Sequence, residues 1–198
     1  MNTGNNIRIA LFASGAGTNA ANIIQYFSNK PPVTIALIVC NNPKAGVLKI
    51  AADNDISSLL IEKEKFFRGD AYVPELQNAG IDFIVLAGFL WKIPSTLINA
   101  YRDKIINIHP ALLPKFGGKG MYGNFVHEAV LSAKEKESGI TIHFVDEFYD
   151  NGKIIFQATC PVYENDTAET LAKRIHTLEY ASFPKVIEEL IEKKLKSI

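Results

Sequence analysis

The sequence predicts an α/β fold, with an open, mostly parallel, twisted sheet, flanking helices and a mixed or antiparallel portion near the C-terminus. Short apolar runs of strand length alternate with longer segments of helical period, and this alternation changes after residue 120. The 198 residues are 47% hydrophobic, enough to bury one sizeable core. We therefore expect residues 1–198 to form a single domain.

Apolar runs in the first part of the chain are short and bounded by turn residues, as expected of strands buried in a parallel sheet. These runs cover residues 7–12, 33–39, 57–61, 83–87 and 104–108. One helix is indicated by apolar residues at helical spacing, namely Ala20, Ile23, Ile24 and Phe27. Shorter helices are expected over residues 46–52, 70–78 and 94–101.

The C-terminal third of the chain has a pattern of strands and a turn that differs from the alternation of strands and helices before it. Residues 141–145 and 153–160 have strand character and flank Asp150-Asn151-Gly152, a strong hairpin-turn signal. We therefore expect antiparallel strands here. A glycine cluster ahead of them, between residues 117 and 123, indicates a mobile loop.

The last helix is predicted from a start signal and an apolar stripe. Asp166 and Glu169 have the spacing of a capping box, and Leu171 and Ile175 begin the stripe that follows. Pro184 lies within this pattern, and proline in a helix interior removes a hydrogen bond and clashes with the preceding turn. We expect Pro184 to kink or restart the helix.

Composition limits the classes of partner. The 21 basic and 21 acidic side chains cancel, which argues against nucleic acid or an anionic membrane as the partner. Cys40 and Cys160 lie far apart without metal-ligand spacing, so neither a metal site nor a disulfide framework is expected. The polar N-terminus has no leader character and no apolar run is long enough to span a membrane, so we expect a cytoplasmic protein.

A phosphate site is indicated directly after the first strand, where residues 14–20 read SGAGTNA and lead into the first helix. Glycine lets the backbone approach an anion, and the free amides and dipole of a helix N-terminus favour negative charge. The segment also fits the dinucleotide fingerprint, but the second strand ends in Asn41 and Asn42 instead of an acid for the ribose hydroxyls. A phosphate monoester is the better fit. The alternative is a tight turn capped by Thr18.

An acid–base site is indicated by Asn107 and His109, which lie two residues apart at the end of a strand and so share a face. With Asp150 nearby, an amide and an imidazole could stabilise an oxyanion and move a proton. Each residue also has a structural reading as a strand-end or turn residue. Their shared position after strands, where open α/β sheets bind ligands, favours the functional reading.

The other polar candidates are weaker. We expect His127 on a helix surface, His143 as a satisfied core or supporting group, and Cys40 as a core residue. No two histidines have the spacing of a metal site, so no metal is expected.

Taken in order, these segments resemble the folate-dependent formyltransferases of purine synthesis over about residues 7–193. The resemblance lies in residues 14–19, 86–89, 107–110 with 112–114, 139–145 and 150–152. It implies a Rossmann-like formyltransferase fold, with nucleotide phosphate bound by the N-terminal half and folate by the C-terminal half. It further implies formyl transfer from 10-formyltetrahydrofolate, as cosubstrate, to the amine of glycinamide ribonucleotide.

The resemblance also implies roles for particular residues. Asn107, His109 and Asp150 would be catalytic through a tetrahedral intermediate, with Asp150 raising the pKa of His109. The residues expected to bind the ribonucleotide are Gly17, Thr18, Asn19, His176 and Glu179. Those expected at the folate are Arg68, Leu90, Trp91, Lys92, Ile93, Asn107, Asp146, Glu147, Phe148, Tyr149 and Asp150.

The chain departs from the family pattern at Leu90-Trp91, where many relatives have Met-Arg, and at Ala111, where serine is common. Related alternatives are a formyltetrahydrofolate hydrolase, which usually carries an N-terminal regulatory domain, and a methionyl-tRNA formyltransferase, which usually carries a C-terminal tRNA-binding domain. Neither extra domain is expected here. A phosphometabolite-binding protein without catalysis is the alternative from another class. For the chain itself we expect a monomer or weak homodimer.

Overall fold

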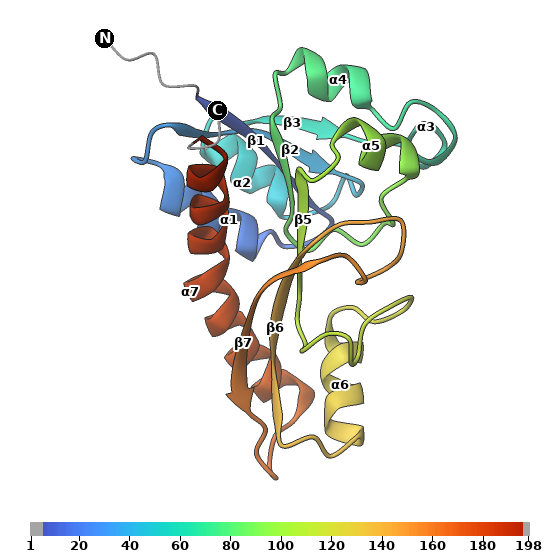
Figure 1. The fold of residues 1–198 in the computed structure, drawn as a ribbon, viewed down its shortest axis with the longest axis vertical. Coiled ribbons are helices and arrows are strands. Elements are labelled where there is room, and N and C mark those ends of the chain that lie inside the picture. The colour runs from blue at the N-terminus through green and yellow to red at the C-terminus, as the bar shows by residue number, and fades with distance from the viewer. Residues whose placement is uncertain (1–5, 196–198) are drawn as a thin grey trace. The chain divides into compact units, whose positions relative to one another are not determined.

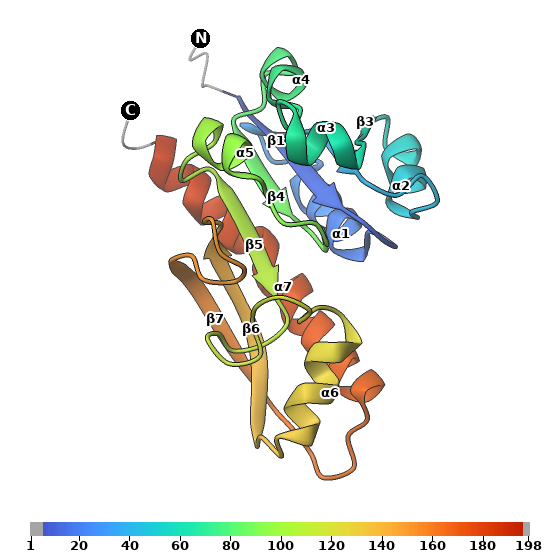
Figure 2. The ribbon, with the colours of Figure 1, turned by 90° about the vertical axis from the view of Figure 1, so that its right-hand side faces the viewer.

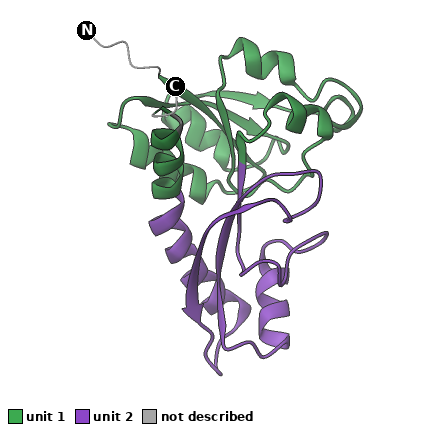
Figure 3. Cartoon of the chain, viewed as in Figure 1, with its two compact units in different colours: residues 1–105, 184–198 green, residues 106–183 purple. Residues whose placement is uncertain are grey.

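A computed structural model describes residues 6–195, and this part of the chain contains seven strands and seven helices (Figure 1). Two compact units are distinguished, one of residues 1–105 and 184–198 and the other of residues 106–183 (Figure 3). The strand order along the sheet is β3-β2-β1-β4-β5-β6-β7. This mixed sheet confirms the predicted fold class.

The first unit contains four parallel strands. They are β1 (Ile7–Ala13), β2 (Val33–Cys40), β3 (Ser57–Leu60) and β4 (Phe83–Leu86), with β1 paired to both β2 and β4. β4 is buried throughout, as is most of β1, which explains why these strands read as continuous apolar runs. The four predicted strands of this part are confirmed, and β5 (Ile105–His109) confirms the fifth.

The expectation that the third strand is buried is wrong. β3 pairs only with β2 and forms an edge of the sheet, and three of its four residues are exposed. Leu60 is 47% exposed. An edge strand has a neighbour on one side only, so its apolar residues can remain in contact with water.

Helices of the first unit are α1 (Thr18–Phe27), α2 (Val47–Asp53), α3 (Lys63–Arg68), α4 (Val73–Asn78) and α5 (Ser95–Ala100). The predicted stripe of α1 is confirmed, because Ala20, Ile23, Ile24 and Phe27 are all buried. The helix predicted over residues 70–78 is shorter and begins at Val73, while α3 was not predicted. Its six residues bury Phe66 alone, which is too little to produce a helical period.

The last helix, α7 (Ala168–Leu195), runs through Pro184 without a break. Of the two predicted outcomes the restart is therefore wrong, and the kink stays a prediction. Phe183, Val186 and Ile187 are buried beside the proline, and this packing maintains the helix despite the missing backbone donor. In the first unit, Glu188 of α7 pairs at 3.0 Å with Lys30, which follows α1.

The start of α7 is capped one residue later than predicted. Thr167 Oγ1 accepts the Thr170 N–H at 3.2 Å, and Thr170 Oγ1 accepts the Thr167 N–H at 2.9 Å. Asp166 instead accepts hydrogen bonds from Arg174 at 2.8 and 3.0 Å. The Asp166 to Glu169 capping box is therefore a wrong prediction, because the carboxylate is used by a guanidinium.

The second unit contains the antiparallel strands β6 (Glu137–Phe144) and β7 (Ile154–Pro161), and the helix α6 (Asn124–Ser132). β6 pairs antiparallel with both β5 and β7, which confirms the mixed C-terminal portion. The predicted tight hairpin at Asp150-Asn151-Gly152 is wrong, because the whole of residues 145–153 connects β6 to β7. Asp150 lies within this longer loop, and its Oδ1 is 3.7 Å from Nε2 of His143 near the end of β6.

No helix among the described residues is long and apolar enough to cross a membrane.

Candidate active site

Asn107 and His109 occupy the end of β5, on the same face of the strand. Buried Ile106 and Ile108 point the other way and fix this face. His109 is only 3% exposed, and Asn107 is half-buried. The strand therefore presents an amide and a sheltered imidazole side by side, as predicted.

Asp150 joins these two residues from the loop after β6. Its Oδ2 lies 3.5 Å from His109 Nδ1, and its Oδ1 lies 3.5 Å from Asn107 Nδ2. The backbone of Asp150 is left-handed, with φ of 50°, a conformation that aspartate tolerates better than most residues. The structure thus brings together all three residues of the predicted acid–base site.

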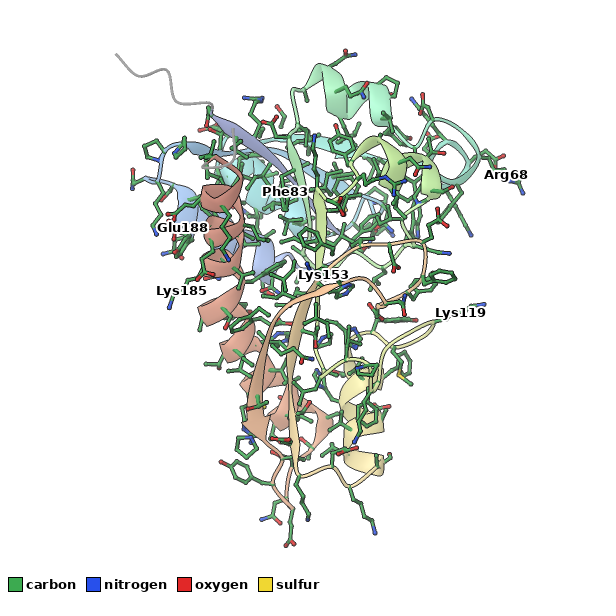
Figure 4. The ribbon with its side chains drawn as sticks, in the orientation of Figure 1. Arg68, Phe83, Lys119, Lys153, Lys185 and Glu188 are labelled. Atoms are coloured by element: carbon green, nitrogen blue, oxygen red, sulfur yellow. The ribbon has the colours of Figure 1, made fainter. Side chains whose placement is uncertain are left out.

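The glycine-rich loop before α6 contacts this site through its backbone. His109 Nε2–H donates to the Phe116 carbonyl at 2.8 Å, and the Gly118 N–H donates to Asp150 Oδ2 at 2.9 Å. A side chain at Gly117 would meet Leu113 at 2.5 Å and Asp150 at 3.2 Å, so the loop lies tightly against the carboxylate. Further along, Lys119 points outward (Figure 4). The predicted mobility of the loop stays a prediction.

Burial lowers the pKa of His109 below its ordinary value. The negative charge of Asp150 and the hydrogen bond to Phe116 raise this pKa, but they do not offset the cost of placing a cation in the interior. The prediction that Asp150 raises the pKa of His109 is confirmed, although burial outweighs this influence and the pKa is lowered overall. At neutral pH the arrangement favours a neutral imidazole.

Asp150 remains a carboxylate. Burial raises its pKa, but the neighbouring His143 ring, the charge of His109 and the Gly118 N–H outweigh that influence and hold the pKa below the usual range. A permanent negative charge beside a neutral imidazole can stabilise positive charge that develops on the imidazole during proton movement. The pair can thus act in general acid–base chemistry.

His143 was expected to be a satisfied core or supporting group, and the structure places it, buried, beside Asn107 and Asp150. Asn107 Nδ2 lies 3.2 Å from His143 Nε2, and Asp150 Oδ1 lies 3.7 Å from the same nitrogen. Asn107 and His143 are opposite one another in the β5–β6 pairing, which brings their side chains to the same face. Only the register of two strands could have revealed this contact.

The predicted phosphate loop connects β1 to α1. Gly17 precedes the helix in the left-handed region, with φ of 79°, and no side chain caps the first turn. A side chain at Gly17 would meet Val47 Cβ at 2.7 Å, so glycine is required for both conformation and space. Thr18 is the first helical residue and is not the cap, which corrects the alternative reading. The first-turn amides of α1 are therefore directed as an anion site requires.

His176 and Glu179, both expected to bind the ribonucleotide, lie together on α7. His176 Nδ1 is 2.8 Å from Glu179 Oε2, and this hydrogen bond raises the pKa of His176. Glu179 is 4% exposed, whereas the ring of His176 is half-exposed and stacks on Tyr180. The pair can present one buried acceptor and one accessible cation.

His127 is not on a helix surface as predicted, because it is only 2% exposed. It lies on the buried face of α6 with Val126 and Val130, and burial lowers its pKa. His176 and Glu179 are close enough to influence that pKa, which places α6 beside the first half of α7 (Figure 2). The single-sequence pattern was too short to show which face of α6 is buried.

Residues 90–93, expected at the folate, continue from β4 in the first unit. The Leu90 N–H donates to Ser14 Oγ at 3.0 Å, while the Leu90 side chain is 53% exposed. Trp91 packs against Phe66 and Phe67, with ring centroids 5.7 and 5.5 Å away. This segment therefore combines a fixed backbone with an exposed apolar surface.

Arg68, also expected at the folate, ends α3 and points outward (Figure 4). Its guanidinium pairs with Glu64 one turn earlier at 3.1 Å, and both side chains are at least 75% exposed. Exposed pairs of this kind contribute little to stability, so Arg68 remains able to bind an anion.

Residues 146–149 form the loop expected to contact folate in the second unit. Asp146 accepts the Phe148 N–H at 2.8 Å and the Asn151 amide at 3.1 Å, which fixes the loop from within. Phe148 is 69% and Tyr149 42% exposed. No group of His, Cys, Asp and Glu within residues 6–195 has the arrangement of a metal site.

Comparison with known proteins supplies the family context for this geometry. The formyl transferase family model matches residues 7–187. Over 195 residues the chain is 40% identical to the chloroplastic phosphoribosylglycinamide formyltransferase of Arabidopsis thaliana, which covers 96% of this chain and 67% of that relative. For the chloroplastic enzyme of Vigna unguiculata the identity is 41%, and the chain spans 62% of that relative.

Bacterial relatives are similar over nearly their whole length. The phosphoribosylglycinamide formyltransferase of Bacillus subtilis is 38% identical over 189 residues, which is 93% of this chain and 94% of the relative. The crystal structure of phosphoribosylglycinamide formyltransferase from Bacillus halodurans superposes with a TM-score of 0.85 at 37% identity, covering 94% of this chain and 96% of that one. The similarity in sequence is thus matched by similarity in fold.

Proposed function

This chain belongs to the formyl transferase family, and from that premise we propose that it transfers a formyl group from 10-formyltetrahydrofolate to the amine of glycinamide ribonucleotide. One observation carries the proposal: Asn107, His109 and Asp150 form one cluster, with Asp150 Oδ2 3.5 Å from His109 Nδ1. Such a cluster can stabilise an oxyanion and move a proton, which are the two demands of acyl transfer to an amine.

The reaction begins when the neutral amine attacks the formyl carbon and forms a tetrahedral species with an alkoxide and an ammonium. Asn107 N–H and His109 N–H would donate to the developing alkoxide. His109 reaches this oxygen only if its Nε2–H leaves the Phe116 carbonyl, to which it donates at 2.8 Å. The Asp150 carboxylate would favour uptake of a proton from solvent by His109, and the resulting imidazolium would donate to the alkoxide more strongly than the neutral ring.

Collapse of the tetrahedral species breaks the bond between the formyl carbon and the folate nitrogen. The ammonium must lose a proton and the departing nitrogen must gain one, so a water held by Asp150 can relay the same proton between them. No covalent bond to the protein is needed. Much of the rate enhancement would come from holding the amine against the formyl carbon.

Binding of the ribonucleotide is assigned to two segments. Backbone amides of Gly17, Thr18 and Asn19 would hold the phosphate at the start of α1. Buried Glu179 would accept hydrogen bonds from the ribose hydroxyls, with His176 as a cationic neighbour whose pKa is raised by Glu179. Both assignments combine the local geometry with the family resemblance.

Folate binding is assigned to two segments and one further residue. The segments are Leu90, Trp91, Lys92 and Ile93, and Asp146, Glu147, Phe148 and Tyr149, and Arg68 would pair with the folate carboxylates. The exposed rings of Phe148 and Tyr149 and the exposed side chain of Leu90 support this assignment. We propose that the chain acts on these small molecules as a single formyltransferase domain, without a metal and as a monomer or weak homodimer.

The test is to follow the loss of 10-formyltetrahydrofolate with and without glycinamide ribonucleotide. Loss that depends on the ribonucleotide supports transfer. Loss without it would instead assign the chain as a hydrolase, in which water replaces the amine. No loss in either mixture, together with ribonucleotide binding by calorimetry, would assign a binding protein without catalysis and overturn the proposal.

A further inference from the structure

The amide of Asn107 can serve the reaction in only one of its two orientations. An Asn side chain carries a donor nitrogen and an acceptor oxygen of similar size, and rotation by half a turn exchanges them. The donor nitrogen stabilises a developing alkoxide, whereas the oxygen repels it. Something must therefore hold Asn107 with its nitrogen toward the site.

The residue in position to do this is His143. It lies opposite Asn107 in the antiparallel β5–β6 pair, and its Nε2 is 3.2 Å from Asn107 Nδ2. Directly opposite side chains in such a pair share a face and contact one another. His143 is 2% exposed, so water does not compete for this contact.

The protonation of the His143 ring follows from its other partner. His143 Nδ1 lies 2.8 Å from the backbone carbonyl of Phe144, and a carbonyl only accepts, so Nδ1 carries the proton. In a neutral imidazole the second nitrogen is then an acceptor. His143 Nε2 thus accepts one N–H of Asn107.

Asp150 acts on the amide in the same direction. Its Oδ1 is 3.5 Å from Asn107 Nδ2, a long contact that leaves the second N–H available to a substrate oxygen. A rotated amide would place the Asn107 oxygen against two acceptors at once, the His143 lone pair and the Asp150 carboxylate. The observed orientation is therefore the one that avoids both repulsions.

Gly152 fixes the carbonyl on which this arrangement depends. A side chain carbon at Gly152 would lie 1.8 Å from the Phe144 carbonyl oxygen, a distance that no real contact allows. The register of β6 against β7 also shifts between Ile142 and His143, and such irregularities re-aim side chains near active sites. Only glycine lets the chain after Asp150 pass this close to Phe144.

We propose that His143 and Gly152 are positioning residues: Gly152 admits the Phe144 carbonyl, that carbonyl fixes the proton on His143 Nδ1, and His143 Nε2 holds Asn107 with its nitrogen toward the formyl oxygen. The inference rests on the proposed formyl transfer. It gives the Asp-Asn-Gly segment two separate tasks, because Asp150 supplies charge and Gly152 supplies space.

The first test compares His143→Gln with His143→Met. The Gln amide oxygen can accept from Asn107 near the position of Nε2, whereas Met has similar length and no strong acceptor. We expect His143→Met to lower kcat by about 30-fold or more, because the hydrogen bond from Asn107 to the formyl oxygen acts in the transition state. KM for both substrates should change less than about threefold. Gln should retain kcat within about fivefold of the wild type.

A merely structural role predicts another pattern, in which Gln and Met lose activity together and in proportion to lost thermal stability. Equal kcat values for the two variants, with both folded by circular dichroism, would overturn the inference. Gly152→Ala should lower kcat as Met does, and a folded Gly152→Ala protein of wild-type activity would contradict the role of Gly152.

The second test needs no turnover. In the wild-type protein with ¹⁵N-labelled histidine, long-range ¹H–¹⁵N spectra identify the protonated nitrogen of His143, assigned by its loss in His143→Gln. We expect the proton on Nδ1, and a proton on Nε2 would refute the inference. If the wild type transfers no formyl group, the proposed function fails, whereas an active wild type with the other tautomer fails only this inference.

Discussion

Replacement of Asp150 by asparagine removes one charge from the site while keeping the shape of the side chain. The amide oxygen of Asn can still accept the Gly118 N–H, which donates to Asp150 Oδ2 at 2.9 Å. What is lost is the negative charge 3.5 Å from His109 Nδ1. Asp150→Asn therefore separates the electrostatic role of Asp150 from its role in holding the loop.

The magnitude follows from that distance. A unit charge pair 3.5 Å apart interacts by roughly 5 kcal/mol at an effective dielectric constant near 20. Only part of this acts on the barrier, because His109 gains partial positive charge and Asp150 is 11% exposed to water. We expect kcat to fall at least about 100-fold, which corresponds to about 2.7 kcal/mol.

The pH dependence gives an independent reading of the same charge. Burial already lowers the pKa of His109, and Asp150 raises it. Without Asp150 the pKa of His109 falls further, so any acidic limb that reports His109 should move to lower pH in Asp150→Asn. The assay is kcat across the acidic to neutral range. Turnover within a few-fold of the wild type in a folded Asp150→Asn protein would refute the reasoning.

Three further predictions concern binding and stability. Gly17→Ala places a carbon 2.7 Å from Val47 at a residue whose φ is 79°, which should distort the loop that holds the phosphate. KM for the ribonucleotide should therefore rise about tenfold or more, while KM for the folate changes little. An unchanged KM for the ribonucleotide would contradict the assignment of the phosphate site. Burial raises the pKa of Tyr101 to about 12, and its hydroxyl finds no hydrogen-bond partner among the described residues. Tyr101→Phe should therefore leave the free energy of unfolding in urea unchanged or raise it by up to about 1 kcal/mol, and a clear loss would count against this. Arg174 holds the pKa of Asp166 well below its usual range. The ion pair therefore stabilises the fold fully at pH values above the usual pKa of a carboxyl group. This contribution is lost as the pH falls toward the lowered pKa. Asp166→Asn should lower unfolding free energy by about 1–3 kcal/mol at neutral pH and by less in acid, and a loss that does not depend on pH would contradict the pairing.

The sheet could be predicted because burial on both faces leaves a direct mark in the sequence. β1 and β4 are continuous apolar runs, since helices or strands cover every side of them. The predicted burial of β3 was wrong, because whether a strand lies at the edge of a sheet depends on strand order. Strand order is decided by tertiary pairing, which no local pattern reports.

The acid–base site was predictable in part because strand geometry fixes which side chains share a face. Asn107 and His109 share a face by strand geometry alone, and Asp150 follows a recognisable turn sequence. His143 was expected as a core or supporting group, but its contact with Asn107 could not be predicted because it depends on the register of β5 against β6. The lowered pKa of His109 could not be predicted, because the sequence shows its charged neighbour but not the depth at which both are buried.

Competition between partners explains the remaining errors. Asp166 has the spacing of a helix cap, but Arg174 in the second turn of α7 binds the carboxylate and leaves the cap to Thr167. His127 was placed on a helix surface, whereas α6 turns that face toward the interior.

Transfer of a labelled formyl group tests the central claim most directly. The wild-type protein is incubated with 10-formyltetrahydrofolate carrying ¹³C in the formyl group, together with glycinamide ribonucleotide, and the products are followed by NMR. We predict that the label appears as a formamide on the ribonucleotide, and that His109→Ala slows its appearance at least about 100-fold. Label recovered as formate, or the same rate in wild type and variant, would contradict the account.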